Sequence, residues 1–204
     1  PFGEAVALAT SSPFGVGGAR FHYSDKEEWV DTVYMGAWPR ATFERIGKFD
    51  EELVRNQDDE FNYRLLSQGG KILLSNRIRS EYFNRGSLRT LARQYFEYGY
   101  WKVRVMQKHP NQIRPRQLVP VVLVVAIIGG MALTPVNRVI RYLWLLTVIV
   151  YSVGNVAASC SLAARHGWRH LRWLPLAFGT LHFSYGTGFL IGLIKFARRW
   201  SERS

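Results

Sequence analysis

The sequence predicts an α/β region over residues 1–109, followed by a region of membrane helices over residues 110–204. The first part alternates short helix and strand candidates, whereas long apolar runs occur only in the second part. Charge divides the chain in a similar way: residues 1–80 hold 10 Lys and Arg against 12 Asp and Glu, and residues 81–204 hold 17 against 3. We therefore expect two regions with different surroundings.

The basic second part restricts the class of partner. Excess positive charge is typical of proteins that bind nucleic acid or an anionic membrane. Because the apolar runs lie in the same part, we expect a membrane and no nucleic acid as the partner. The single cysteine, Cys160, lies in one of these runs, so no internal disulfide can form and an oxidising compartment is not indicated.

The first part contains several short elements. Residues 4–10 are apolar and Ala-rich and predict a helix, and the Gly-rich residues 14–18 predict a turn. Residues 29–34 mix β-branched and aromatic side chains, which predicts a strand. That strand would place Gly36 at its carboxyl end, where ligands bind in open α/β sheets. A short helix over residues 39–47 and strands over residues 71–75 and 78–83 are expected to follow.

Three consecutive acids, Asp58, Asp59 and Glu60, open a predicted helix that Gly69 and Gly70 end. Carboxylates are favourable at a helix start because the first backbone N–H groups are unpaired and the helix dipole is positive there. Apolar residues follow at helical spacing, so Asp58 would be held at the rim of a core, as a general base must be. The simpler interpretation is a solvated acidic cap.

A long helix is predicted over residues 87–109, with Ser87 as its N-cap. Its early turns carry Arg89 and Arg93, and five aromatic residues follow. Arginines and aromatic rings together are typical of a helix at a membrane interface. The same arginines would equally suit an acceptor that carries a diphosphate.

Three apolar runs follow, at about residues 118–133, 142–164 and 173–197. A bilayer core about 30 Å thick needs roughly 20 helical residues. The second run meets this length, the first is marginal, and the third is long enough but polar in its middle. Helices buried in a large soluble protein are the alternative interpretation, and the basic clusters at each boundary argue against it.

The basic clusters also indicate an orientation. The side before the first run should be cytoplasmic, because cytoplasmic loops carry an excess of Lys and Arg. The residues that mark it are Lys102, Arg104, Lys108, Arg114 and Arg116. Three full crossings would place Arg198 and Arg199 on the opposite side, against the same rule. The sequence leaves open whether the third run crosses the membrane.

Residues from about 30 to 99 resemble the acceptor half of family 2 glycosyltransferases of the GT-A fold. The shared features are a glycine after a strand, here Gly36, an Ile-Gly-x-Phe-Asp-Glu turn at residues 46–51, and an acidic pair followed by Arg64-Leu65. Gln57 stands where the family has the first acid of the pair. Residues 12–17, 56–60, 107–110 and 114–116 look most like bacterial exopolysaccharide enzymes of the succinoglycan-glucosyltransferase type.

The resemblance implies an inverting transfer of a sugar from a nucleotide diphosphate sugar to an acceptor hydroxyl, with Asp58 as the base that takes the hydroxyl proton. It implies that Gly36, Asp59, Glu60 and Arg93 contact the acceptor, a lipid-linked saccharide, although Glu60 would equally suit a structural cap. The family holds its donor and a divalent cation, Mg or Mn, with an upstream Asp-x-Asp, which does not occur in this sequence.

We therefore expect this chain to be the C-terminal part of a longer enzyme and to be inactive alone. The intact protein is expected to be a multi-pass protein of the bacterial cytoplasmic membrane whose soluble part faces the cytoplasm. Two alternatives stay open. One is a non-catalytic, membrane-anchored binding or scaffolding module that kept the acceptor lobe. The other is a transporter or channel piece built on the apolar runs, which is poorly supported because few ionisable groups, mainly His182, lie within them.

Overall fold

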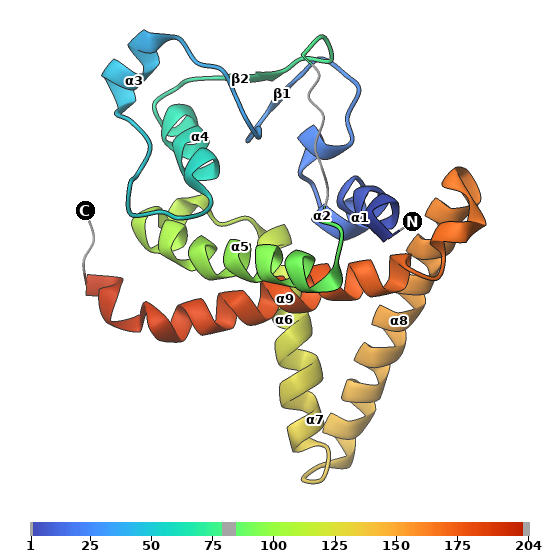
Figure 1. Ribbon diagram of the computed structural model, residues 1–204. Coiled ribbons are helices and arrows are strands. Elements are labelled where there is room, and N and C mark those ends of the chain that lie inside the picture. Colours follow the sequence, from blue (N-terminus) through green and yellow to red (C-terminus); the bar gives the residue numbers. More distant parts are fainter. Residues whose placement is uncertain (1, 79–84, 202–204) are drawn as a thin grey trace.

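The computed structural model describes residues 2–78 and 85–201. Short helices, loops and a small sheet form one side of the molecule and rest on a pair of long helices, α5 and α9 (Figure 1). A helical hairpin projects from the other side. The main elements are α1 (Phe2–Thr10), α2 (Pro13–Val16), β1 (Glu28–Val30), α3 (Arg40–Ile46), α4 (Gln57–Ser67), β2 (Ile72–Leu74), α5 (Leu88–Lys108), α6 (Pro115–Val124), α7 (Gly130–Leu133), α8 (Arg138–His166) and α9 (Leu174–Lys195).

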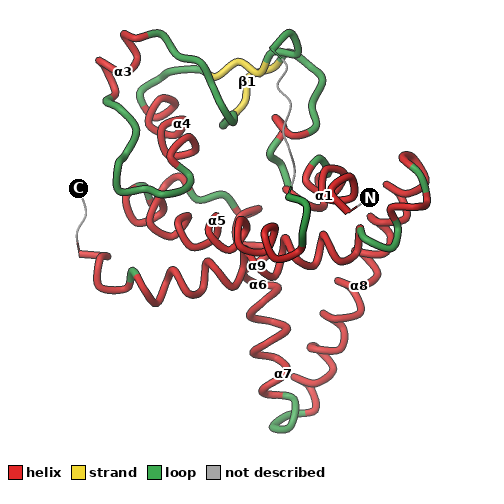
Figure 2. Tube along the Cα trace, viewed as in Figure 1, coloured by secondary structure: helices red, strands yellow, loops and turns green. Residues whose placement is uncertain are grey.

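The predicted α/β fold class, the acceptor half of a GT-A domain, is wrong. The described residues contain two strands of three residues each, which pair antiparallel with Val30 opposite Ile72 (Figure 2). The strand expected over residues 29–34 ends at Val30, because its partner β2 begins at Ile72, opposite Val30. Beyond it, the amide of Asn62 donates to Thr32 Oγ1 at 3.0 Å and to Val33 O at 2.9 Å. Of the strand expected over residues 78–83, only residue 78 is described.

Helix α4 forms where the acidic stretch predicts it. Its first turn carries the three acids, and Gly69, with a positive φ of 76°, lies just beyond its end and donates to Leu66 O. The buried face of α4 presents Phe61 and Leu65 to a small core completed by Ile46, Ile72 and partly buried aromatic rings. Burying these side chains fixes α4 to α3 and to the β1–β2 sheet, on the side of α5 away from the hairpin.

Helices α5 and α9 lie side by side over most of their length (Figure 1). Their backbones touch at glycines: a Cβ atom added to Gly99 would lie 2.0 Å from Tyr185 O, and one added to Gly188 would lie 2.1 Å from Phe96 O. The start of α5 agrees with the sequence, because the Ser87 hydroxyl accepts a hydrogen bond from Thr90 N at 3.3 Å. Helix α9 covers one face of α5 through these contacts.

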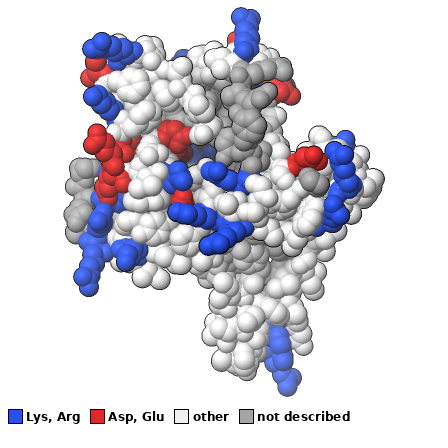
Figure 3. Space-filling view, in the orientation of Figure 1, with Lys and Arg blue, Asp and Glu red and all other residues white. Residues whose placement is uncertain are grey.

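The hairpin consists of α6, a π-helical turn (Val125–Gly129), α7 and the 29-residue α8. A π turn frees a backbone carbonyl, and the indole Nε1 of Trp144 in α8 donates to Ile127 O at 2.9 Å. In the view of Figure 3 the hairpin surface carries no charged side chain until its tip. Residues 117–137 and 142–164 of the hairpin contain no Asp, Glu, Lys or Arg, as expected of lipid-facing segments.

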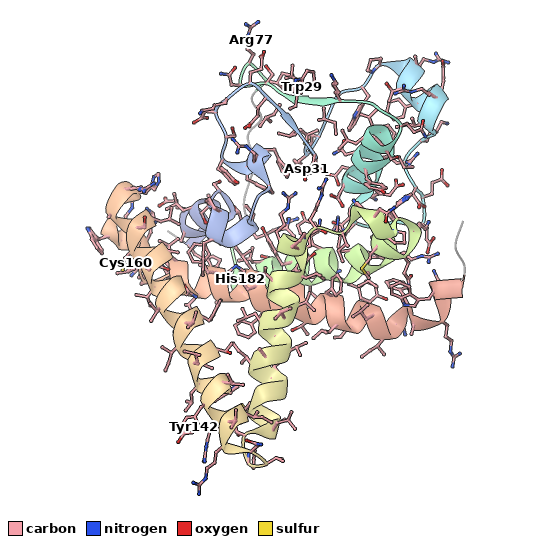
Figure 4. All side chains as sticks on the ribbon, turned by 180° about the vertical axis from the view of Figure 1, so that it is seen from behind. Trp29, Asp31, Arg77, Tyr142, Cys160 and His182 are labelled. Carbon is pink, nitrogen blue, oxygen red and sulfur yellow. The ribbon has the colours of Figure 1, made fainter. Side chains whose placement is uncertain are left out.

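Three helical stretches among the described residues are long and apolar enough to cross a membrane: Pro115–Leu133, Arg138–His166 and Leu174–Lys195. The first two have 11% of their most apolar 18-residue window buried inside the protein, and the third has 44%. Helix α9 runs across the open end of the hairpin rather than along it (Figure 1). The polar centre of α9 contains His182 (Figure 4). The Nε2 of His182 contacts Phe14 O at 2.9 Å, and its Nδ1 contacts the Tyr151 hydroxyl at 3.1 Å.

Candidate functional site

Asp58 is the candidate base, and it lies partly buried at the first turn of α4. Its Oδ1 accepts a hydrogen bond from the backbone N–H of Asp59 at 2.9 Å. Among residues 2–78 and 85–201, no cationic side chain forms an ion pair with it. Burial raises the pKa of Asp58 above its usual value, and the neighbouring charge of Asp59 adds to the increase.

Asp58 lies on the side of α4 that faces the loop after β1. Residues four apart on a helix share a face, so Asp58 is aligned with Asn62. Asn62 is fully buried and donates to Thr32 and Val33 of that loop. The face of α4 that carries Asn62 is thus held against the loop after β1.

Asp59 holds a buried cation. Its Oδ2 binds the ammonium of Lys102, and Gln112 Nε2 donates to the same oxygen at 2.7 Å. Lys102 is a buried residue of α5. An uncompensated charge in that position would be costly, so Asp59 neutralises it and fixes α4 to α5. Its predicted contact with the acceptor remains a prediction.

Glu60 is enclosed by protein partners, with only 2% of its side chain exposed. Its Oε1 contacts Arg64 Nε at 2.6 Å and His109 Nε2 at 2.8 Å. Burial favours the neutral acid, but the hydrogen bonds from His109 and Arg64 outweigh it and lower the pKa of Glu60. Arg64 also donates to Ile46 O and Lys48 O, so Glu60 helps to hold the turn before α4. This geometry favours the structural cap over acceptor binding.

A second ionic cluster fixes that same turn to the end of α5. Glu52 accepts hydrogen bonds from Arg104 Nε at 2.6 Å and is paired with Lys108 Nζ at 2.7 Å, and Lys108 also binds Asp50. The hydrogen bond from Arg104 has the largest effect on the pKa of Glu52. Burial opposes it, but Lys108 adds to it, and the pKa falls to about 2.

Gly36 and Arg93 lie in different surroundings from Asp58. A Cβ at Gly36 would lie 2.6 Å from the Trp38 ring, so this glycine makes room for an aromatic side chain. Arg93, on α5, donates to Glu97 Oε1 at 2.9 Å, and Glu97 Oε2 accepts from Arg55 Nε at 2.9 Å. Arg55 is three residues before Asp58. Through Glu97, Arg93 is therefore connected to the segment that begins α4.

A small pocket and a larger groove lie next to some of these residues. A pocket of about 20 Å³ between Asp59, Gln112 and Asp31 holds little more than one water molecule, and Asp58 does not line it. It is too small for a sugar, so it is not the acceptor site in this conformation. A larger, open groove of about 390 Å³ lies between α5 and α9 and is lined in part by Arg93.

The described residues contain no group of three or more His, Cys, Asp or Glu side chains that could hold a metal ion. The divalent cation that the resemblance implies therefore does not fit a set of ligands in this part of the chain. No step is assigned to it here.

Two curated proteins are similar to this chain. Succinoglycan biosynthesis protein ExoA of Rhizobium meliloti (strain 1021) is 27% identical over 205 residues, which cover 97% of this chain and 58% of that protein. The second, from Methanococcus voltae, is 28% identical over 106 residues, which cover 52% of this chain and 33% of that protein. It is the dolichyl N-acetyl-alpha-D-glucosaminyl phosphate 3-beta-D-2,3-diacetamido-2,3-dideoxy-beta-D-glucuronosyltransferase.

One relative acts in succinoglycan biosynthesis, and the other is a glycosyltransferase by name. No protein-family model and no solved structure matches the chain. Membership of family 2 and of the GT-A fold class is thus not shown by these comparisons. This chain spans about half the length of the Rhizobium protein and a third of the Methanococcus enzyme.

Sequence reasoning missed the partners that separate the three acids. Lys102 was noted only as a mark of orientation, and the roles of Gln112 and Arg55 were not foreseen. The sequence contains no signal for these partners, because only the structure shows that the polar Lys102 and Gln107 stand among the buried residues of α5. Polar residues on the covered face of a helix call for polar partners.

Proposed function

We propose that this chain is part of a membrane-bound glycosyltransferase in which Asp58 is the general base. The observation that carries the proposal is the state of Asp58: a partly buried carboxylate with a raised pKa and no described ion-pair partner, at the start of a fixed helix. The two relatives support the class of reaction, because both act in glycan synthesis by name.

The step assigned to Asp58 is a proton transfer. The acceptor hydroxyl oxygen forms a bond to the anomeric carbon of the donor sugar while the bond from that carbon to the nucleoside diphosphate breaks. The carboxylate of Asp58 takes the hydroxyl proton, and the leaving diphosphate keeps the electron pair of its bond. A free aspartate is a weak base, with a pKa of about 3.9, so the raised pKa makes Asp58 better suited to this step.

The neighbouring acids are less suited to the role. Asp59 compensates Lys102, and both oxygens of Glu60 accept from Arg64. A carboxylate held by a cation has a lower affinity for a proton than one without such a partner. Of the three acids, Asp58 is the one that combines a fixed position with an available carboxylate.

The donor and acceptor belong to the activity of the whole protein. We propose a nucleotide diphosphate sugar as donor, used with a divalent cation, and a lipid-linked saccharide as acceptor. The Methanococcus relative supports this class of acceptor, since its name specifies a dolichyl-phosphate-linked sugar. The Rhizobium relative supports a role in bacterial exopolysaccharide synthesis. Neither donor nor cation is assigned a residue in this chain.

We further propose that the protein lies in the bacterial cytoplasmic membrane as a two-span hairpin, with α9 along the membrane surface. Helices α6, α7 and α8 expose their apolar side chains, whereas α9 is half covered and lies across them. The basic residues at both ends of α9 then lie on the same side of the membrane as α1 to α5 and the small sheet. This satisfies the positive-inside rule if that side is cytoplasmic. Arg138 and Arg141, in the first turn of α8 at the hairpin tip, would then lie on the other side.

The test is the variant Asp58→Asn in the full-length protein, assayed in membranes with a panel of radiolabelled nucleotide diphosphate sugars and extracted lipid acceptors. Loss of a general base should lower kcat about 100-fold to 10,000-fold. The matched control is Asp25→Asn, on an exposed loop, which should leave kcat unchanged. Unchanged transfer by Asp58→Asn would remove the base assignment. No transfer by the unmodified protein with any donor would favour the scaffolding alternative.

A further inference from the structure

The open groove between α5 and α9 is lined by three residues from each helix: Ala92, Arg93 and Phe96 from α5, and Phe183, Ser184 and Thr187 from α9. Its volume of about 390 Å³ is within the range of small-molecule sites. The lining combines two aromatic rings with one cation and two hydroxyl groups. A ligand that fills it must therefore have both an apolar part and a part that accepts hydrogen bonds.

The polar groups of the groove have unused hydrogen-bonding capacity. Arg93 donates through Nε to Glu97, and 82% of its side chain is exposed. Within the described part of the chain, no partner is hydrogen bonded to the hydroxyls of Ser184 and Thr187. In contrast, the hydroxyl of Thr180, on the same helix, donates to Leu176 O at 2.7 Å. The two groove hydroxyls and the outer guanidinium nitrogens thus remain available to a ligand.

The position of the groove narrows the choice of ligand. Helix α9 is placed at the membrane surface by the topology proposed above, so the groove lies where polar and apolar media meet. A free sugar nucleotide has no apolar chain to cover Phe96 and Phe183. A phosphorylated lipid has both parts: its phosphate oxygens match a guanidinium and hydroxyl groups, and its chain continues into the bilayer beside the hairpin.

The groove is also connected to the base. Glu97 joins Arg93 to Arg55, and the side-chain amide of Asn56 donates to Tyr98 O at 3.0 Å. The segment that begins α4 is therefore attached to α5 one turn beyond the groove. A lipid whose phosphate lies at Arg93 would direct the sugar it carries toward the first turn of α4.

From these observations we propose that the α5–α9 groove binds the phosphate and the first lipid units of a polyprenyl-phosphate-linked acceptor. Arg93, Ser184 and Thr187 contact the phosphate, and the two phenylalanines contact the chain. The inference rests on the proposed function, because it assigns a place to the acceptor of that reaction. It adds a binding site that is separate from the base.

The experiment measures binding of farnesyl diphosphate to the detergent-solubilised full-length protein, with inorganic diphosphate and farnesol as partial ligands. Farnesyl diphosphate is expected to bind at least tenfold more tightly than either. Arg93→Gln should weaken it about tenfold or more, because hydrogen bonds to charged groups are among the strongest. Thr187→Val should weaken it to a smaller extent.

Two matched controls accompany these variants. Arg89→Gln removes an exposed arginine one turn earlier on α5 that does not line the groove, and Thr180→Val removes a hydroxyl already bonded to its own helix. Both should keep the affinity within about twofold. Equal losses for Arg89→Gln and Arg93→Gln would reduce the effect to general surface charge and overturn the proposal. Equal affinities for inorganic diphosphate and farnesyl diphosphate would also overturn the proposal, because they would indicate a site for free phosphate.

The same binding measurement in Asp58→Asn separates this inference from the proposed function. If the groove binds the lipid independently of the base, the affinity of Asp58→Asn is unchanged while its transfer is lost. If Asp58→Asn still transfers sugar while Arg93→Gln weakens lipid binding, the assignment of the base is refuted and the groove proposal stands. If Asp58→Asn loses transfer while Arg93→Gln leaves lipid binding unchanged, the groove proposal is refuted and the assignment of the base stands.

Discussion

The glycine contacts between α5 and α9 allow the packing of these helices to be tested with single substitutions. In Gly188→Ala the added Cβ would lie 2.1 Å from Phe96 O and 2.8 Å from Phe96 C, whereas ordinary contact begins at 3.4 Å. Both atoms belong to the backbone of α5, so no side-chain rotation can relieve the clash and the helices must separate. Overpacking of this kind costs about 1–3 kcal/mol.

Gly179→Ala is the matched control because it lies in the same helix and its Cβ would meet no atom within 4 Å. Both variants gain the helix propensity of alanine, about 1 kcal/mol, so the difference between them isolates the clash. A change of 1 kcal/mol shifts the Tm of a domain of this size by about 2–4 °C. Gly188→Ala should therefore unfold about 2–12 °C below Gly179→Ala.

Thermal unfolding in detergent, followed by the fluorescence of the 7 tryptophans, measures this difference. Equal Tm values for the two variants, or a higher value for Gly188→Ala, would refute the close backbone contact. The α5–α9 groove would then lose its structural basis.

Two predictions concern pH and topology. Because the folded-state pKa of Glu52, about 2, lies below its usual 4.5, its ion pairs stabilise the protein above about pH 4.5 and this contribution is lost as the pH falls toward 2. The Tm of Glu52→Gln should therefore lie below that of the unmodified protein at neutral pH, and this difference should become smaller as the pH falls. Glu44→Gln, which removes an exposed ion pair, should change the Tm little at any pH. In a Cys160→Ser background, Val136→Cys at the hairpin tip should react with an impermeant maleimide from outside the cell, and Trp200→Cys should react only after permeabilisation. External labelling of both positions would show that α9 crosses the membrane.

The elements that the sequence predicts well are those fixed by neighbouring residues. Ser87 caps α5, and the acids and Gly69 bound α4, because caps and helix ends depend on side chains within one turn. The strand over residues 29–34 fails for the opposite reason. Its β propensity finds no partner beyond Val30, because β2 begins at Ile72, and Val33 O accepts from the amide of Asn62, some thirty residues later, instead.

The candidate site shows the same limit. Asp58, Asp59 and Glu60 are adjacent and chemically similar, so their sequence does not separate their environments. The difference comes from Lys102 and His109, more than forty residues away, which are hydrogen bonded to Asp59 and Glu60 but not to Asp58. The orientation of the third apolar run is similarly undetermined by its composition, because it depends on the glycine contacts with α5.

These contacts form one continuous support between the membrane and the proposed base. The hairpin is joined to α9 where Gly186 meets the backbone of Pro120, and α9 is joined to α5 through Gly99 and Gly188. Helix α5 then holds α4 through the buried Lys102–Asp59 pair. Two of these joints are close backbone contacts, and the third pairs the buried Lys102 with the partly buried Asp59. In the topology proposed above, these contacts would keep Asp58 at a fixed height above the bilayer, as the proposed base for a lipid-held hydroxyl requires.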